Sequence, residues 1–526
     1  MEQQRMLQKN HRPHAVIIGG GIAGCALGLF LACESGFRVS IFEAYSRTQA
    51  VNGGIGGGLQ LAPNGMRVLK HLGLAERLRR LGVESPCFEF RGHDGHLIVR
   101  THVDPKGRYD QPSVLMTRAT LHQVLVEAVE HEQEQNNNTT IEFDKRLVGA
   151  SGIEAEDEAY DLADANSGPV MLQFEDGSRA CGDLVVCADG VHSKMRSLLL
   201  GEDDPKACYL GLVSLGGFAH SDIFLEKPES EQGVINFLFS PEGSMMGYCR
   251  ATGDDPRLVM WWRNMQVANH PKLMQLLGLS SAADERLYQP PTKEELQAMD
   301  TDELKRCILH LPGGEEWSPV LRQMVEDTDT ILRGTISDVV HIPRWAQGRA
   351  CLIGDAAHAV SPHSGQGASL ALEDSMFLAK MLRLALHEHR SRHEHDDEDL
   401  PFPITLLQRA FKAYEHGRKA RVEKIVAEGR RRGEQRRNTK EEPSGPGAVK
   451  RWLIEGMMYL AFKHLAQPLF GQVFGYRIEW DDGKTLRQIE AEQREQASGA
   501  WAKTVGTAVI LTAVLVPVVA LLLHRR

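Results

Sequence analysis

The segment 14–24 carries the residues whose spacing best suits ligand chemistry, because an apolar run leads into Gly19, Gly21 and Gly24. Glycines at this G-x-G-x-x-G spacing permit a tight turn, let a pyrophosphate approach the backbone, and let the following helix pack closely. The N-terminus of that helix then faces the anion. The segment therefore predicts a strand, a phosphate-binding turn and a helix.

An acidic residue follows at the distance at which a nucleotide-binding unit needs one. The apolar run 37–42 ends at Glu43, about 20 residues past the glycines. A carboxylate at this place can accept hydrogen bonds from ribose hydroxyls, so the order is strand, helix, strand and acid. Glycine-rich turns also occur without nucleotides, but this context favours a dinucleotide. The unit does not separate NAD from FAD.

A second segment lies more than 300 residues further along the chain. There Asp355 follows the apolar pair at 352–353 and is expected at the carboxyl end of a buried strand, where open α/β sheets bind ligands. Pro362 and the turn Gly365-Gln366-Gly367 then lead into an apolar helical periodicity that starts at Ala368. The aspartate could accept hydrogen bonds from ribityl hydroxyls, and the helix N-terminus would favour negative charge on a reduced isoalloxazine. The alternative is an ordinary strand-turn-helix with an N-cap aspartate.

A third segment, 183–196, combines a buried strand with the pair Asp189-Gly190. Ser193 and Arg196 follow one helical turn apart. Taken together, the three segments resemble the fingerprints of class A flavin-dependent monooxygenases, which include salicylate and p-hydroxybenzoate hydroxylases and fungal secondary-metabolite hydroxylases and epoxidases. Further matching segments are 56–64, 118–121, 345–349 and 414–421, so that the resemblance covers roughly residues 14–430.

The resemblance implies FAD as the cofactor and NAD(P)H as a co-substrate. It implies that Glu43 binds ribose, that Gly56 and Gly57 approach the flavin, that Arg118 contacts FAD, and that Asp355 and Ala368 touch the ribityl chain and flavin. The full set of expected cofactor-binding residues is Gly19, Gly21, Gly24, Glu43, Gly56, Gly57, Arg118, Asp189, Asp355, Pro362, Gly365, Gly367 and Ala368. The chain departs from the common family pattern at Ala368, where many members carry asparagine.

Arg196 matches the family's motif arginine, which is linked to pyridine nucleotide or substrate handling, and it is our first catalytic candidate. Taken alone, Arg118 and Arg196 each fit a surface ion pair nearly as well. Tyr248 is the second catalytic candidate, because its hydroxyl could hydrogen-bond a phenol or carbonyl, although a tyrosine in a strand more often serves packing. No cluster has metal-ligand spacing, so no metal is expected.

The reaction is narrowed by the absence of the Trp-x-Trp-x-Ile-Pro signature of flavin halogenases. The family then implies that NAD(P)H reduces FAD and that one oxygen atom from O2 hydroxylates or epoxidises an aromatic, polyketide or terpenoid substrate, as in secondary metabolism. The alternatives are a flavin-dependent reductase or dehydrogenase of a polyprenyl-type lipid and a non-catalytic, membrane-anchored protein that keeps the Rossmann fold as a binding scaffold.

The 526 residues are enough for several domains, and we expect an α/β protein with α+β elements. A Rossmann-like FAD-binding domain would be formed by 1–205 and 341–437, with an inserted antiparallel-sheet substrate domain at 206–340 and a linker with helices at 438–504. The candidate walls of the substrate site are the aromatic residues Phe237, Phe239, Tyr248, Trp261 and Trp262. Because side chains alternate along a strand, about half of them should face away from the substrate. The net charge of −10 gives no support for nucleic-acid binding, and nine scattered cysteines favour a reducing compartment. No obligate protein partner is evident.

The stretch 505–523 contains no charged residue. At about 1.5 Å per residue it nearly spans a hydrocarbon core about 30 Å thick, which favours a transmembrane helix over a buried terminal helix. Residues 1–14 have no apolar signal-peptide core, so we expect a single-pass C-terminal anchor with the catalytic body in the cytosol. The endoplasmic reticulum is favoured over the mitochondrial outer membrane. The apolar stretch 452–462 would pack on the body or lie on the membrane surface.

Overall fold

The computed structural model describes residues 12–52, 57–104, 106–151, 169–240, 244–279, 284–311, 316–392, 402–438, 455–460, 462 and 466–503. Gly56 and the apolar stretch 505–523 lie outside these residues. Within the described ranges, no helix has both the length and the apolar character needed to cross a membrane.

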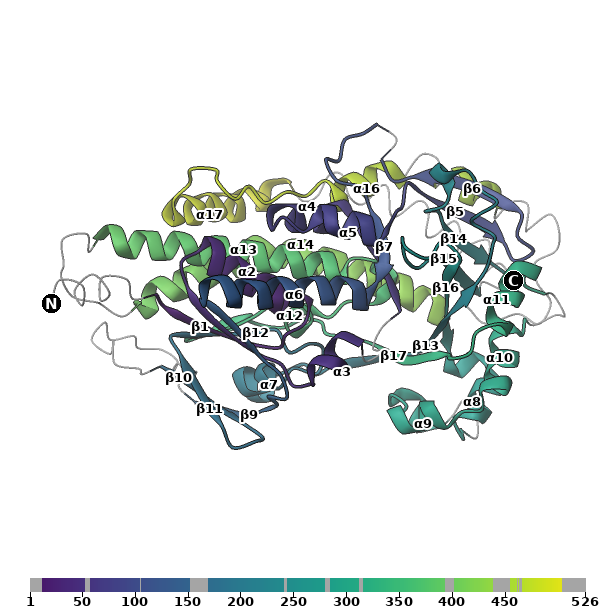
Figure 1. Cartoon of the computed structure of the whole chain (residues 1–526), viewed down its shortest axis with the longest axis horizontal. Coiled ribbons are helices and arrows are strands. Elements are labelled where there is room, and N and C mark those ends of the chain that lie inside the picture. Colours follow the sequence, from purple (N-terminus) through teal and green to yellow (C-terminus); the bar gives the residue numbers. More distant parts are fainter. Residues whose placement is uncertain are drawn as a thin grey trace.

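A six-stranded sheet forms the centre of the first body, on the left of Figure 1. Its strands, in spatial order, are β18 (Ala346–Gln347), β19 (Ala350–Leu352), β12 (Leu184–Cys187), β1 (His14–Ile18), β2 (Arg38–Phe42) and β8 (Thr139–Glu142). All neighbours pair in parallel except β18 and β19. Strands β1 and β12 are almost entirely apolar and buried, as expected of parallel strands covered on both faces. Residues that follow these strands therefore gather at one edge of the sheet.

Helices cover one face of this sheet, and a small antiparallel sheet covers the other. On β1, Ile17 points toward α2 (Ile22–Leu29), whereas the neighbouring Val16 points toward β11 (Arg179–Gly182). The helical layer continues with α6 (Arg118–Asn136), α13 (Gly367–Arg392) and α14 (Ile404–Asn438). The other face is covered by β11 together with β9 (Leu147–Ser151) and β10 (Val170–Phe174). This layering buries the apolar residues of both faces of β1.

A seven-stranded sheet forms the second body, on the right of Figure 1. Its spatial order is β17 (Leu332–Asp338), β13 (Cys208–His220), β16 (Leu258–Gln266), β15 (Met245–Arg250), β14 (Ile235–Phe239), β5 (Cys87–Gly92) and β6 (Leu97–His102). The pairing is antiparallel except between β14 and β5. Strands β5 and β6 come from the region that the sequence assigned to the FAD-binding part. Their pairing with β14 joins segments about 147 residues apart, which no local pattern reveals.

The two faces of the seven-stranded sheet have different neighbours. One face packs against helices α8 (Pro271–Leu276), α9 (Lys293–Ala298), α10 (Thr301–Leu309) and α11 (Pro319–Glu326). The opposite face packs toward the first body through β3 (Gly58–Leu61), β7 (Val114–Thr117) and α16 (Ala466–Phe474). Because side chains alternate along a strand, Trp261 faces the helices whereas Trp262 faces the first body.

The C-terminal part lies along the helical layer of the first body. After α16, residues 475–485 run past α4 (Pro63–His71) and α13 to α17 (Leu486–Lys503), at the top of Figure 1. The Arg383 guanidinium of α13 lies 4.4 Å from the centre of the Trp480 ring, and Arg409 of α14 pairs with Glu490 of α17 at 2.9 Å. These contacts attach the C-terminal part to α13 and α14.

Candidate active site

The glycine-rich turn follows β1, and its three glycines meet different surroundings. Gly19 has a φ of +103°, and a Cβ there would lie 2.4 Å from the Ala188 carbonyl oxygen. A Cβ on Gly24 would lie 1.9 Å from the Gly19 carbonyl oxygen. A Cβ on Gly21 would meet no atom within 4 Å. The outer glycines are therefore required by the fold, and Gly21 keeps space open at the N-terminus of α2, as a bound phosphate needs.

Glu43 lies directly after β2 and is held from two sides. Its Oε2 accepts a hydrogen bond from the Gly20 N–H at 2.8 Å, and its Oε1 accepts one from the Tyr45 N–H at 3.0 Å. Each carboxylate oxygen has a second lone pair, so a ribose hydroxyl can be bound by the same group. The backbone bonds fix the carboxylate beside the glycine turn.

Asp355 follows β19 at the same edge of the sheet and begins α12 (Asp355–His358). Its side chain is exposed to solvent. Desolvation by the surrounding protein nevertheless raises the pKa of its carboxyl group, while the charges of His358 and Arg118 lower it by a smaller amount. A perturbed carboxylate of this kind is typical of a functional site. The Arg118 N–H donates to the Gly57 carbonyl at 3.1 Å. The structure thus brings Arg118 near both Gly57 and Asp355.

The segment after Asp355 forms an exposed turn that leads into α13. Gly365 has a φ of +61° and ends the short 3-10 helix that begins at Pro362. Pro362 and Gly365 are exposed, whereas Gly367 and Ala368 at the start of α13 are half-buried. The first turn of α13 therefore lies directly behind a turn that is open to a ligand.

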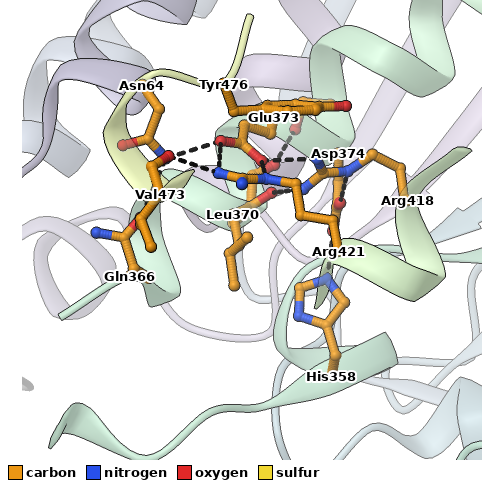
Figure 2. A network of polar contacts seen from close by, with 12 residues as sticks. Asn64, His358, Gln366, Leu370, Glu373, Asp374, Arg418, Arg421, Val473 and Tyr476 are labelled. Carbon is orange, nitrogen blue, oxygen red and sulfur yellow. Dashed lines mark hydrogen bonds and ion pairs between the residues drawn. The ribbon is translucent and has the colours of Figure 1, made fainter. Parts of the chain in front are cut away.

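A buried acidic pair on α13, which the sequence reasoning missed, supports both of these segments (Figure 2). Asp374 Oδ2 accepts hydrogen bonds from the Gly354 N–H at 3.0 Å and from His358 Nε2 at 2.5 Å. Two adjacent carboxylates in an otherwise apolar helix were the available signal. Arg418 of α14, within the matching segment 414–421, is the partner of this pair. It is fully buried, and its Nε lies 2.8 Å from Asp374 Oδ1.

Arg196, the first catalytic candidate, is buried and hydrogen-bonded within the protein. Only 2% of its side chain is exposed, and its Nε lies 2.9 Å from Asp204 Oδ1. Its Nη1 and Nη2 donate to the carbonyls of Ala356 and Val191 at 3.1 and 3.0 Å. All three nitrogens are thus engaged within the protein. In the structure Arg196 therefore ties α7 (Lys194–Leu200) to α12, and its catalytic role stays a prediction.

Asp189 lies at the predicted edge of the sheet, but its carboxylate caps α7. It accepts hydrogen bonds from Ser193 Oγ at 2.5 Å and from the Met195 N–H at 3.0 Å. Desolvation raises the pKa of this carboxyl group even though these hydrogen bonds oppose the shift. These two contacts of Asp189 are therefore structural, while the adjacent Gly190, with a φ of +82°, faces open space.

Tyr248, the second catalytic candidate, lies on the face of its sheet that packs against helices. It is buried in the cluster covered by α8 to α11, with its ring centre 6.0 Å from that of Phe224. Its strand neighbour across the sheet is Trp261, which faces the same helices. Burial raises the pKa of Tyr248 to about 12. Strand register thus turns this side chain away from the first body, and its catalytic role stays a prediction.

The residues at the sheet edge fit FAD on structural grounds. Gly21 leaves room for a pyrophosphate at a helix N-terminus, Glu43 offers a fixed carboxylate, and Asp355 offers an accessible one beside Arg118. Gly56 lies outside the described residues, so the structure places only Gly57 of that pair.

Comparisons with known proteins agree with this geometry. Residues 13–301 and 327–399 match a family model described as FAD binding domain. The chain is 25% identical over 424 residues to a 6-hydroxynicotinate 3-monooxygenase of Pseudomonas fluorescens, covering 78% of this chain and 89% of the relative. It is 29% identical over 361 residues to a 3-amino-4-hydroxybenzoate 2-monooxygenase of Streptomyces cremeus, covering 68% and 75%.

Solved structures share the fold. HpxO of Klebsiella pneumoniae, in complex with FAD and uric acid, superposes with a TM-score of 0.61 at 20% identity, covering 89% of this chain and 97% of that protein. The matched family model spans more than half of the chain and includes the glycine turn, Glu43 and Asp355. The chain therefore belongs to the FAD binding domain family and is a class A FAD-dependent monooxygenase.

Proposed function

We propose that this protein hydroxylates or epoxidises an electron-rich carbon of a small, planar and largely apolar substrate, with NAD(P)H as reductant and O2 as oxidant. The names of two relatives support an aromatic substrate, since they act on 6-hydroxynicotinate and 3-amino-4-hydroxybenzoate. The observation that carries the proposal is an aromatic wall on the sheet face that adjoins the flavin-binding turns.

That sheet face reaches the first body at two places. A Cβ on Gly58 would overlap the Met260 sulfur at 1.8 Å, so β3 and β16 are in close contact. Further along β16, Asn264 Nδ2 lies 3.3 Å from Nε2 of His363, which follows Pro362. A substrate between the sheet and these turns would therefore meet the residues between Met260 and Asn264.

Aromatic rings occupy the centre of this face. A Cβ on Gly247 would lie 2.2 Å from the Trp262 ring, so the indole lies across a position where only glycine leaves room. The Phe237 ring meets Trp262 edge-on, with centres 5.8 Å apart and planes at 82°. Phe90 stacks on Phe237 at 5.6 Å. Cross-strand register places Gly216, Trp262, Gly247, Phe237 and Phe90 in one row without a charged side chain.

Such a row binds a planar, uncharged ring by burial and by edge-to-face or stacked contacts, each worth about 0.5–1.5 kcal/mol beyond the buried area. Trp262 and Phe237 are half-buried, which leaves part of each ring available. The chemistry itself belongs to FAD, which when bound accepts a hydride from NAD(P)H and activates O2. The chain's residues orient the cofactor at the sheet edge, hold the substrate ring against the row, and keep water away from the reacting carbon.

The proposal includes a membrane anchor at 505–523, supported by the uncharged composition of that stretch. A basic tip follows it at 524–526, and the body would remain in the cytosol. Fractionation of the full chain and of a chain ending at Lys503 tests this. The full chain should sediment with membranes and require detergent, and the shorter chain should not. Equal recovery of both in the soluble fraction would contradict the anchor.

The oxygenation is tested with purified protein, NADPH and a panel of aromatic, polyketide and terpenoid compounds under ¹⁸O2. A product heavier by one ¹⁸O atom supports the proposal. A product that gains or loses only hydrogen would contradict it and would establish the reductase or dehydrogenase reaction. A Trp262→Leu variant serves as the matched control, because it alters the aromatic row and keeps the residues expected to bind flavin.

A further inference from the structure

The acidic pair of α13 belongs to a buried group of balanced charge (Figure 2). Glu373, Asp374 and Arg418 are at most 1% exposed, and Arg421 is 13% exposed. Arg418 Nη1 lies 2.6 Å from Glu373 Oε2, and Arg421 Nη2 lies 2.9 Å from Glu373 Oε1. Two carboxylates thus face two guanidinium groups. Buried charges are tolerated only when each keeps its partner, so the loss of one contact affects the whole group.

One side of this group holds the flavin-binding turns. Asp374 binds the Gly354 N–H immediately before Asp355. Glu373 Oε1 accepts a hydrogen bond from Asn64 Nδ2 at 2.7 Å, and the same Asn64 nitrogen donates to Gln366 Oε1 at 3.0 Å. The two carboxylates therefore set the position of both segments that would face the ribityl chain and the isoalloxazine.

The other side of the group is covered by residues 472–482, which we call the strap. Arg421 Nη2 donates to the Val473 carbonyl at 2.9 Å. The Tyr476 ring lies 4.0 Å from the Arg421 guanidinium and 5.4 Å from that of Arg418. Figure 2 shows this ring lying across the arginines. The strap lies beyond residue 399, where the matched family model ends.

The strap has a second attachment that does not use these charges. Trp480 lies under Arg383 and packs on Phe30, with ring centres 5.3 Å apart. Lys380 Nζ lies 2.7 Å from Asp482 Oδ2. The chain thus offers two aromatic anchors on one strap, of which Tyr476 contacts the buried arginines and Trp480 contacts α13 further along. This pair separates a specific effect on the flavin site from a general loss of stability.

We propose that the strap is a positioning element for FAD, with Tyr476 as its key residue. The ring shields the two arginines from water, the shielded arginines keep Glu373 and Asp374 in place, and the carboxylates hold the turns at Gly354 and Gln366. Strap docking and FAD binding therefore stabilise each other, since coupling between two sites is reciprocal. The inference rests on FAD binding and is independent of which substrate is oxygenated.

The test uses the full chain, stripped of flavin, and measures the FAD dissociation constant by fluorescence titration together with the unfolding temperature of each flavin-free variant. Tyr476→Leu should weaken FAD binding about fivefold to tenfold, as expected for the loss of a shielded cation–π contact. Tyr476→Phe keeps the ring and should bind FAD like the wild type. Trp480→Leu should lower the unfolding temperature and weaken FAD binding less than Tyr476→Leu does, because Trp480 does not contact the buried arginines.

A second readout addresses the reciprocal effect. In the wild-type protein, FAD should slow amide hydrogen exchange in residues 472–476, and this protection should disappear in Tyr476→Leu. If Tyr476→Leu fails to fold, Arg421→Lys replaces it, because lysine keeps the charge but loses the second hydrogen-bonding arm. The proposal is overturned if Tyr476→Leu and Trp480→Leu weaken FAD binding equally, or if Tyr476→Leu binds FAD as the wild type does. Neither result depends on turnover, so neither bears on the oxygenation reaction.

Discussion

Replacing Gly21 or Gly24 with alanine adds the same methyl group at two positions of one turn, with opposite expected results. At Gly24 the new carbon would lie 1.9 Å from the Gly19 carbonyl oxygen, so helix and strand must separate by more than about 1 Å. Overpacking of this kind costs about 1–3 kcal/mol. At about 2–4 °C per kcal/mol in a large domain, the unfolding temperature of Gly24→Ala should fall by several degrees.

Gly21→Ala should leave the fold intact and weaken cofactor binding. Its φ of −75° and ψ of −166° are open to alanine, and no atom lies within 4 Å of the added methyl group. The loss of glycine at the N-cap destabilises the fold, whereas the lower conformational entropy of the unfolded chain stabilises it. Each effect is about 1 kcal/mol or less, so the two nearly cancel. The methyl group would occupy the space at the N-terminus of α2. We expect FAD to bind at least about 100-fold more weakly, a loss of about 2.7 kcal/mol.

The assay measures thermal unfolding of the flavin-free proteins and FAD binding by fluorescence titration. Gly149→Ala is the matched control, because Gly149 lies in β9 and a Cβ there also meets no atom within 4 Å. It should leave both quantities unchanged. Wild-type FAD affinity in Gly21→Ala, or a wild-type unfolding temperature in Gly24→Ala, would refute the reasoning.

Three further predictions concern the site residues. The folded protein raises the pKa of Asp355, so folding favours its protonated form and the wild type loses stability as pH rises above about 4. In scanning fluorimetry, flavin-free Asp355→Asn should therefore unfold at a higher temperature than the wild type at about pH 7, and this difference should disappear near about pH 4. In an FAD titration, the variant should bind FAD more weakly. A lower unfolding temperature at neutral pH would contradict this. Tyr248→Phe should leave kcat/KM and its pH profile unchanged, because burial raises the pKa of Tyr248 to about 12 and its ring faces the helices. A tenfold loss of kcat/KM, about 1.4 kcal/mol, would support the catalytic role of Tyr248. Trp262→Leu should raise KM for the substrate about tenfold with the FAD dissociation constant unchanged, and an unaltered KM would remove Trp262 from the substrate site.

Much of the cofactor-binding architecture could be predicted from local patterns. The apolar runs before Gly19, Glu43 and Asp355 are strands of one parallel sheet in the structure, and those residues stand at its carboxyl edge. Short-range sterics carry this information, since a glycine turn and a following helix are specified within about ten residues. The alternating runs of the second body likewise form antiparallel strands.

The roles of the two catalytic candidates could not be predicted in the same way. The alternation of side chains along β15 indicated that Tyr248 and its neighbours point to two opposite faces of the sheet. It did not indicate which face meets the first body, because a one-residue shift in strand register exchanges the two faces. Arg196 and Arg418 carry charges that a sequence reading places at the surface. Their burial depends on Asp204, Ala356 and Asp374, which approach only after folding.

The sequence by itself determined the family, the cofactor and the order of strands and turns that bind it, because these depend on residue types within short segments. The tertiary structure decided which face of the second sheet meets the flavin-binding turns, that β5 joins β14, and that the strap covers the arginines behind the turns. These features depend on contacts between residues from about 50 to 300 positions apart, whose stability comes from mutual burial of apolar area and charge. No local sequence pattern predicts such pairings, because each residue becomes buried and paired only when the distant partner has folded against it.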